Sequence, residues 1–320
     1  MFDDILVPLD GSDAAESALG HAVAVARATD AALHVLRVVR PGRAGGLEHD
    51  AVEWRMDRTE AKTYVDDCAD RLRPLGVDAE CAVSEGRPEE EIIAYARRHS
   101  IDLIVLTTQG RTGAPEFEIG STAYKVVQGA GTSVLLVRPG ENHGHRPDED
   151  GYRRILVPVD GSSRGEWAVC LASTLISASP RGELILVHVV PVPEMVTRIP
   201  ADEELDSLRG QIVEASHRAA ERYFDQLRSR IERPDLTVES RILISPQVTA
   251  TLQQAAEAGE ADLVVISAHG ASGSAPWPYG SIASHLIRYG HRPLLVLQDE
   301  PAGDRPSGRP EMAGERSHAR

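Results

Sequence analysis

Short apolar runs alternate with longer segments of helical period along most of the chain. Segments such as 102–107 (DLIVLT) and 262–267 (DLVVIS) are apolar at nearly every position, which is typical of strands that helices cover on both faces. In the first half, this pattern predicts strands at 4–9, 32–39, 78–83, 102–107 and 133–137.

The segments between these runs have the period of amphipathic helices. Residues 13–29 place alanine and valine at helical spacing after Ser12, whose side chain is suited to cap the first turn. The charged stretches 48–75 and 203–231 also have helical period. Because strand and helix alternate over five strands, we predict an α/β fold with helices on both faces of a parallel, doubly wound sheet.

The chain contains this pattern twice, which indicates two tandem domains. Residues 5–12 read ILVPLDGS, residues 155–162 read ILVPVDGS, and the later turns recur in the same order. Such a repeat is typical of an internal duplication. We therefore predict two doubly wound domains, each with a five-stranded parallel sheet, at 1–138 and 153–298, with a linker at 139–152 and a disordered tail at 299–320.

Two turns at the carboxyl ends of the first and fourth predicted strands contain the candidate chemistry. The first strand runs into Asp10, and the fourth is followed by Gly110, nine further residues, and then Gly120 and Ser121 at a helix start. In a doubly wound sheet these ends face one crevice. Glycines permit close backbone approach and the free N–H groups of a helix start suit an anion, so phosphate is the expected ligand. The second half repeats the set as Asp160, Gly270, Gly280 and Ser281. A single turn of this kind is more simply an ordinary strand-to-helix connection, and it is the matched pair that favours a site.

This combination resembles the universal stress protein superfamily. The nucleotide-binding members of that superfamily have G-x-x-G, nine residues and G-S/T, together with an early strand that ends in aspartate. The first copy here reads Thr-Thr-Gln-Gly at 107–110 and the second reads Ser-Ala-His-Gly at 267–270, each followed by nine residues and Gly-Ser. The resemblance covers residues 3–298 and implies ATP, with or without Mg²⁺, as the bound cofactor.

The resemblance also implies a role for each matched position. Asp10 would bond the ribose or adenine side of ATP, main-chain groups near Val38 would contact the adenine, and Pro8 would shape the first turn or simply end the strand. The second half supplies Asp160, Val189 and Pro158 for the same roles. The phosphates would be held by Gly110, Gly120, Ser121, Gly270, Gly280 and Ser281.

The chain departs from the family motif at several positions. Thr107 and Ser267 replace the first glycine, and a positive φ there would cost about 1–2 kcal/mol. The first loop contains Arg111, a candidate phosphate partner, together with acids at 116 and 118 that would repel a phosphate. The second loop has no cation, and its Trp277 and Tyr279 either cover a ligand or pack against the protein.

Three functions are compatible with these residues. The leading one is a nucleotide-binding regulatory stress-response protein, in which ATP occupancy of one or both domains changes the interaction with a protein partner. The others are a stress scaffold with vestigial pockets and a slow ATP hydrolase. The chain has no G-x-x-x-x-G-K-[ST] loop, and its histidines form no catalytic arrangement by spacing. His269, the best placed of them, reads as a polar turn residue, so no catalytic residue is assigned.

Composition excludes several classes of partner. A net charge of −15 gives no general attraction to nucleic acid or to anionic membranes. Neither a signal peptide nor a membrane-spanning run is visible, so we expect a cytoplasmic protein. Cys68, Cys81 and Cys170 lack the spacing of zinc or disulfide sites. His143 and His145 in the linker are expected to be solvated, so no metal site is predicted.

The fifth predicted strands of the two halves are apolar edges. They read SVLLV at 133–137 and PLLVL at 293–297, and such edges would favour aggregation if they were uncovered. The family resemblance implies that these edges pair two domains, here within one chain. Further association would give a homodimer.

Overall fold

The computed structural model describes residues 1–40, 51–110, 119–139, 147, 151–176, 182–193, 203–234, 236–270 and 278–298. The strands are β1 (Asp4–Leu9), β2 (Ala32–Val39), β3 (Ala79–Glu85), β4 (Leu103–Thr107), β5 (Ser133–Val137), β6 (Arg154–Pro158), β7 (Gly182–Pro191), β8 (Leu236–Ser245), β9 (Leu263–Ser267) and β10 (Leu294–Leu297). The helices are α1 (Asp13–Thr29), α2 (Ala51–Leu72), η1 (Arg73–Leu75), α3 (Pro88–Arg98), α4 (Ser121–Gly129), α5 (Ser163–Ile176), α6 (Glu203–Ile231), α7 (Val248–Ala258) and α8 (Ser281–Tyr289). The predicted α/β class is confirmed.

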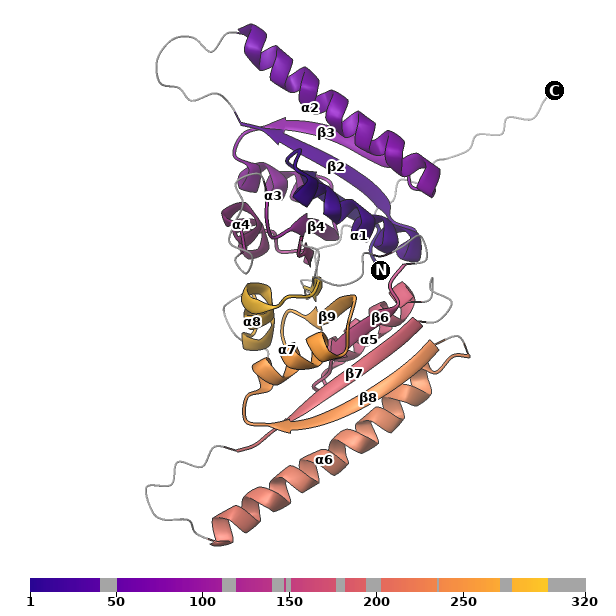
Figure 1. The fold of residues 1–320 in the computed structure, drawn as a ribbon, viewed down its shortest axis with the longest axis vertical. Coiled ribbons are helices and arrows are strands. Elements are labelled where there is room, and N and C mark those ends of the chain that lie inside the picture. Colours follow the sequence, from indigo (N-terminus) through magenta and orange to yellow (C-terminus); the bar gives the residue numbers. More distant parts are fainter. Residues whose placement is uncertain are drawn as a thin grey trace, which may run out of the picture.

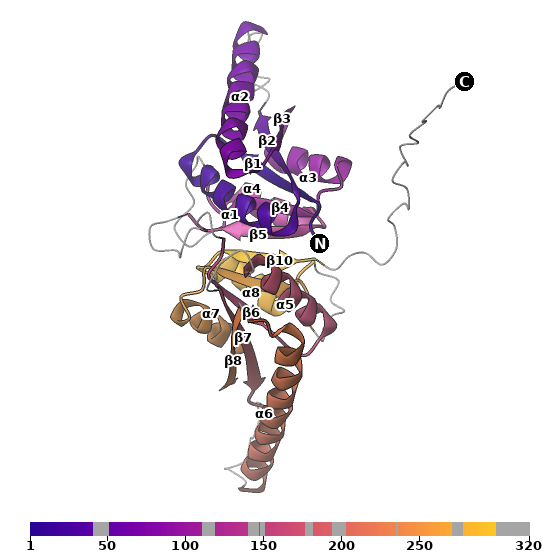
Figure 2. The same ribbon diagram turned by 90° about the vertical axis from the view of Figure 1, so that its right-hand side faces the viewer.

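All these strands belong to one sheet with the order β3-β2-β1-β4-β5-β10-β9-β6-β7-β8. Neighbouring strands are parallel within each half, and the two halves meet where β5 pairs with β10 in antiparallel register, with Leu135 opposite Leu295. Figure 2 shows β5 and β10 side by side at the centre of the molecule. The apolar fifth strands therefore cover each other within one chain. A homodimer of such chains stays a prediction.

Helices cover both faces of the sheet, and each face has its own apolar core. Along β1, Ile5 and Val7 pack into the core beneath α1, α2, α5 and α6, whereas Leu6 packs into the core beneath α3, α4, α7 and α8. This alternation follows from the period of two along a strand. Figure 1 shows the two halves stacked end to end, with α2 and α6 at the outer ends.

The first helix of each half is capped by the serine that follows the strand-end Asp-Gly. The Ser12 side chain accepts a hydrogen bond from the Ala15 N–H at 3.2 Å, as the sequence predicts for an N-cap. The Ser162 side chain accepts one from the Gly165 N–H at 3.1 Å. The two halves therefore position α1 and α5 on the sheet by the same local bond.

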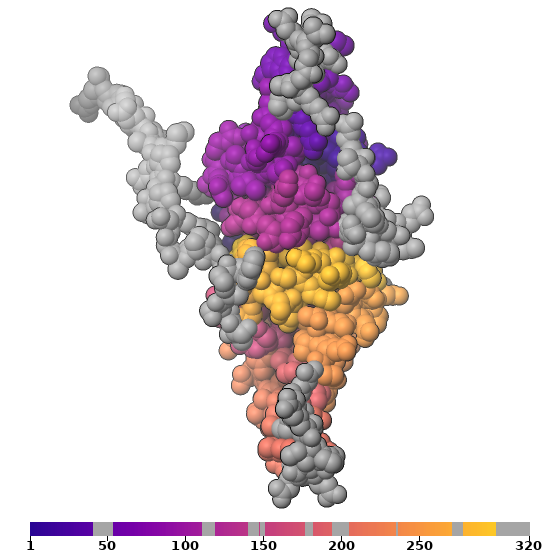
Figure 3. Space-filling view, turned by 90° about the vertical axis from the view of Figure 1, so that its left-hand side faces the viewer, coloured from indigo at the N-terminus to yellow at the C-terminus, as the bar shows by residue number. Residues whose placement is uncertain are grey.

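Side chains cross the boundary between the halves and bond to the ends of opposing helices. Arg138 follows β5 and donates to the carbonyls of Leu286 and Ile287, at 3.3 and 2.6 Å, in the last turns of α8. The Tyr279 hydroxyl donates to the Val127 carbonyl of α4 at 2.8 Å. Cations and donors are favourable at a helix C-terminus, where carbonyls lack intrahelical partners. Figure 3 shows the yellow surface of α8 and β10 against the magenta surface of the first half.

The expected linker ends in a buried anchor. Tyr152 is fully buried, and its hydroxyl lies 2.9 Å from Nδ1 of His21 on α1. The preceding residues 140–146 and 148–150, with His143 and His145, and the tail 299–320 lie outside the described residues. No helix in the described part of the chain is long and apolar enough to cross a membrane.

Candidate functional site

The carboxyl ends of β1 and β4 separate at the point where the strand order reverses. Pairing between these strands covers Ile5 and Leu6 only, whereas β1 continues alongside β2 as far as Leu9. Pro8 lies in this stretch and has no N–H with which to extend a ladder. In the second half, β6 likewise pairs with β9 at two residues and then reaches Pro158. Pro8 lies inside β1, whereas Pro158 is the last residue of β6. We call the place where these neighbouring strands separate the crevice, because the strand order predicts a ligand site there.

Asp10 and Gly110 meet where β1 and β4 separate. A Cβ atom added to Gly110 would lie 2.6 Å from Oδ2 of Asp10, closer than real Cβ atoms approach an oxygen. A Cβ on Gly270 would collide in the same way with Oδ2 of Asp160. In each half, the strand-end aspartate and the glycine of the fourth-strand turn are therefore in direct contact.

The other carboxylate oxygen of each aspartate is held by the following serine. Oδ1 of Asp10 accepts bonds from the Ser12 N–H at 3.0 Å and the Ser12 hydroxyl at 2.5 Å, and Asp160 accepts the same pair from Ser162 at 3.0 and 2.6 Å. The glycine between the aspartate and the serine, Gly11 or Gly161, has φ of +79° in both halves. Side chains disfavour this conformation, so Asp-Gly-Ser is a structural unit. Gly11 and Gly161 were not among the predicted site residues, although Asp-Gly is a recognised turn signal.

The second glycine of each turn is positioned by the strand end. The Gly120 N–H donates to the Thr108 carbonyl at 2.7 Å, and a Cβ on Gly120 would lie 3.0 Å from that oxygen. Gly120 has φ of −60°, so a close approach rather than backbone conformation calls for glycine here. Gly280 donates to the Ala268 carbonyl at 2.8 Å in the same way. The exposed Ser121 and Ser281 that follow begin α4 and α8.

The replaced first glycine of the motif does not strain the backbone. Neither Thr107 nor Ser267 has a positive φ. The free-energy cost of a side chain in that conformation therefore does not apply here. Instead, the Thr107 hydroxyl donates to the Gln109 carbonyl at 2.6 Å, and the Ser267 hydroxyl donates to the His269 carbonyl at 2.8 Å. The two hydroxyls stabilise the same turn, which the sequence motif alone did not reveal.

A basic side chain beside the crevice differs between the halves. Val38 and Val189 lie near the ends of β2 and β7, half-buried and buried respectively. The residue before Val38 is Arg37, which donates to the Leu9 carbonyl at 3.2 Å and lies 3.6 Å from the position of a Cβ on Gly11.

In the second half, Nδ1 of His188 lies 2.8 Å from the Val159 carbonyl, the counterpart of that bond. The guanidinium of Arg37 carries a permanent positive charge. No sequence motif marks Arg37, so it was not among the predicted site residues.

Several residues of the two turns have a different or an undescribed placement. Arg111, Trp277 and the acids at 116 and 118 lie outside the described residues. Tyr279 is 4% exposed and its hydroxyl donates to a carbonyl of α4. It therefore packs against the protein and does not cover a ligand. Burial raises the pKa of Tyr279 to about 12, so its hydroxyl stays a donor at neutral pH.

Comparisons with known proteins agree with this architecture. The profile of the Universal stress protein family matches residues 1–138 and 151–298. A universal stress protein of Mycolicibacterium smegmatis is 24% identical over 306 residues, which are 92% of this chain and 96% of that protein. Universal stress protein YxiE of Bacillus subtilis is 32% identical over 148 residues, 43% of this chain and 100% of that protein. A solved universal stress protein from Archaeoglobus fulgidus is 19% identical, covers 92% of this chain and 98% of its own, and has a TM-score of 0.60.

Proposed function

Because the chain belongs to the universal stress protein family, with the family match occurring twice in tandem, we propose that it is an ATP-binding regulatory protein of the stress response. ATP would occupy the crevices at the carboxyl ends of the strands. Its presence would order the loops around the crevice and change the surface offered to a protein partner.

The contact between the strand-end aspartate and the glycine of the fourth-strand turn supports the proposal most directly. With Oδ1 of Asp10 held by Ser12, Oδ2 stays on the side of the crevice where Gly110 lies. A carboxylate oxygen in that place can accept hydrogen bonds from a ribose. A geometry of this kind that occurs in both halves is more than a strand-to-helix connection needs.

The residues present fit a nucleotide in three further respects. Gly120 lacks a Cβ where the backbone approaches most closely, and the first N–H groups of α4 have no intrahelical acceptor. Arg37 supplies a positive charge beside the first crevice. ATP would contribute the triphosphate charge that such a helix start and guanidinium attract.

One observation favours a second function for the second half. Its crevice has His188 where the first has Arg37. A weaker or vestigial second pocket would leave that half as a scaffold for association. ATP hydrolysis is a third outcome, for which the described residues provide no catalytic arrangement.

The test begins with the nucleotides that copurify with the chain, followed by titration calorimetry with ATP on the stripped protein. We expect bound adenine nucleotide, and a loss of affinity in Asp10→Ala and Gly120→Ala. Gly20→Ala is the control, because Gly20 is exposed on α1 with nothing within 4 Å of an added Cβ. If the protein purifies without nucleotide and gives no heat with ATP, the proposal is overturned. If the parent binds ATP but cells that carry the binding-deficient variants survive stress as well as cells that carry the parent, the scaffold function is supported instead.

A further inference from the structure

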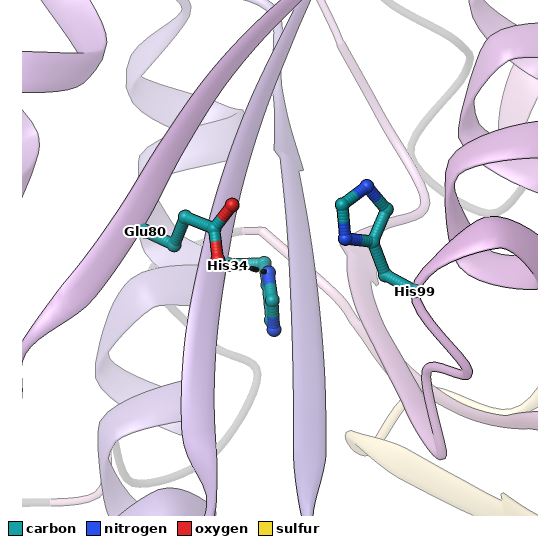
Figure 4. A group of neighbouring side chains, drawn as sticks. All are labelled: His34, Glu80 and His99. Atoms are coloured by element: carbon teal, nitrogen blue, oxygen red, sulfur yellow. Dashed lines mark ion pairs between the residues drawn. The ribbon is translucent and has the colours of Figure 1, made fainter.

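A second cluster of polar side chains lies at the opposite edge of the first half, at the amino ends of the strands. His34 on β2, Glu80 on β3 and His99 at the C-terminal cap of α3 each offer one atom suited to bind a metal, and these atoms lie within 4.8 Å of one another. Figure 4 shows His34 and Glu80 on adjacent strands, with His99 on the side of α3. We call these three residues the His34 cluster. It is separate from the proposed nucleotide crevice.

Hydrogen bonding prepares His34 to offer Nδ1 as a ligand. The His34 side chain is 7% exposed, and its Nε2 lies 2.9 Å from Oδ1 of Asp4. A carboxylate accepts hydrogen bonds, so Nε2 bears the proton and the lone pair is on Nδ1. A carboxylate that orients an imidazole through its far nitrogen is the usual arrangement behind a metal-ligating histidine.

Two acceptor atoms then face each other inside the cluster. Nδ1 of His34 lies 3.6 Å from Oε2 of Glu80. The Tyr95 hydroxyl donates to Nδ1 at 3.2 Å, which is a long hydrogen bond for an O–H donor. A cation bound between Nδ1 and the Glu80 carboxylate would be attracted by both acceptors and would take the place of this bond.

The second half provides a matched site without these groups. Ile185 pairs with Glu239 in the register in which His34 pairs with Glu80. A Cβ on Gly259, which follows α7 as His99 follows α3, would lie 3.5 Å from Cδ1 of Ile185.

Glu239 in that half bonds instead to Arg241, at 2.6 and 2.8 Å. The fold is therefore complete with isoleucine and glycine at the positions of the two histidines. In the first half, the ring of Tyr95 stacks on His99 and lies edge-on to His34, whereas α7 has Ala255 at that position. The two histidines therefore pack against Tyr95 and also offer ligand atoms on their side toward Glu80.

We propose that the His34 cluster binds one divalent transition metal ion of the Zn²⁺ class. Its ligands would be Nδ1 of His34, a ring nitrogen of His99 and the Glu80 carboxylate, with solvent in a fourth position. Two imidazoles and a carboxylate are a common zinc ligand set. Bond lengths of about 2.0–2.1 Å place tetrahedral ligand atoms about 3.3 Å apart. The Glu80 side chain is 63% exposed and can close the remaining gap by rotating.

The metal alone is the probe. Zn²⁺ would be titrated by calorimetry into the full chain after chelator treatment, in a His143→Ala, His145→Ala background that removes the linker histidines as competing ligands. We expect one equivalent of Zn²⁺ per chain, bound with micromolar or tighter affinity. His99→Ala and Glu80→Gln should each weaken binding at least tenfold. Glu239→Gln is the control and should leave the affinity unchanged.

A variant behind the ligands tests whether His34 itself is engaged. Asp4→Asn keeps the shape of the side chain and removes the carboxylate that orients His34, so the affinity should fall about 10–100-fold. Because Glu80 is mostly exposed, Glu80→Gln stays informative even if a histidine variant fails to fold. One equivalent that persists in both Glu80→Gln and His99→Ala would overturn the proposal, as would the absence of binding at 100 µM Zn²⁺.

Discussion

The two halves of the molecule are alike at one edge of the sheet and different at the other. At the carboxyl ends of the strands, the contact of Asp10 with Gly110 recurs as that of Asp160 with Gly270. At the amino ends, His34 is matched by Ile185. At the carboxyl edge, the turns need a glycine with positive φ, a serine that bonds the aspartate, and a glycine where a Cβ would collide, so few other residues fit. At the amino edge, either polar or apolar side chains fit. The geometry that both halves share therefore depends on the backbone of these turns, and the geometry that differs depends on side chains.

The boundary between the halves gives a second comparison. Arg138 binds the end of α8, but the residue after β10 that corresponds to it is Gln298, which donates to the Pro278 carbonyl at 3.4 Å. Tyr279 binds the end of α4, and Ile119 stands at the corresponding place before α4. The backbone has a two-fold repeat, and each half uses a different residue to bind the opposing helix.

Of the changes considered, substitution of the crevice glycines should change ATP affinity most, and in one half at a time. In Gly110→Val, the new Cβ collides with Oδ2 of Asp10 and displaces it. We expect ATP affinity at the first site to fall about 100-fold, or about 2.7 kcal/mol, with the second site unaffected. Gly270→Val should do the reverse. Titration calorimetry would measure both the affinity and the number of sites for each variant.

The control for this pair is Gly210→Ala on α6, where an added Cβ meets nothing within 4 Å. It should bind ATP as the parent does and be more stable by roughly 0.5–1 kcal/mol. If Gly110→Val left ATP binding at both sites intact, the crevice would not be the binding site in the first half. If only Gly270→Val had no effect, the halves would differ in function as well as in sequence.

Removal of Arg138 should have the next largest effect, on stability. Arg138→Met keeps the length of the side chain and removes both bonds to α8. We expect the free energy of unfolding to fall by about 2 kcal/mol, because bonds from a charged donor are worth about 1.5–3 kcal/mol each and part of that is offset by relief of a buried charge. Gln298→Met removes a longer bond to the Pro278 carbonyl and a bond to the Tyr279 hydroxyl, both from a neutral donor. Urea unfolding of this variant should show a loss of about 1 kcal/mol or less. Equal losses would contradict the asymmetry of the boundary.

The fold was largely readable from the sequence, and the site only in part. Apolar runs located the five strands of the first half to within two residues, and the repeat located the second half. The contact between Asp10 and Gly110 depends on strand order and could be inferred from the topological rule for such sheets.

Arg37 and the Thr107 hydroxyl could not be inferred, because their partners are main-chain carbonyls. Such bonds leave no residue-type signal in the sequence. The His34 cluster was missed because its members come from two strands and a helix end that lie far apart in the chain. Only the register of β2 with β3 places Glu80 beside His34.

Exchange of the basic residue beside the crevice should change ATP affinity less than the glycine substitutions do. Arg37→His copies His188, which already bonds to the corresponding carbonyl, so the hydrogen bond is retained while the permanent charge is lost. One charge at about 4 Å contributes about 1 kcal/mol in water, so affinity at the first site should fall roughly fivefold.

The reverse change, His188→Arg, should strengthen the second site by a similar factor. Both effects should shrink as the salt concentration rises. Calorimetry at low and at high salt would separate this charge effect from a change in packing. Affinities that do not respond to either exchange would place the phosphates away from residues 37 and 188.

Loss of the Tyr279 hydroxyl should have the smallest effect, and a distinct pH dependence. Tyr279→Phe removes the bond to the Val127 carbonyl and should lower the free energy of unfolding by about 0.5–1 kcal/mol at neutral pH. Burial raises the pKa of Tyr279 to about 12 in the folded chain, against about 10 when unfolded. Its contribution is therefore complete below pH 10 and is lost as the pH rises through 12. The stability difference between parent and variant, followed by urea unfolding from pH 8 to pH 11, should narrow above pH 10.

Ile119→Val is the matched change in the first half. The stability difference that it causes should be independent of pH, because neither side chain titrates. A constant difference for Tyr279→Phe over this range would mean that the hydroxyl is accessible to water and does not cap α4.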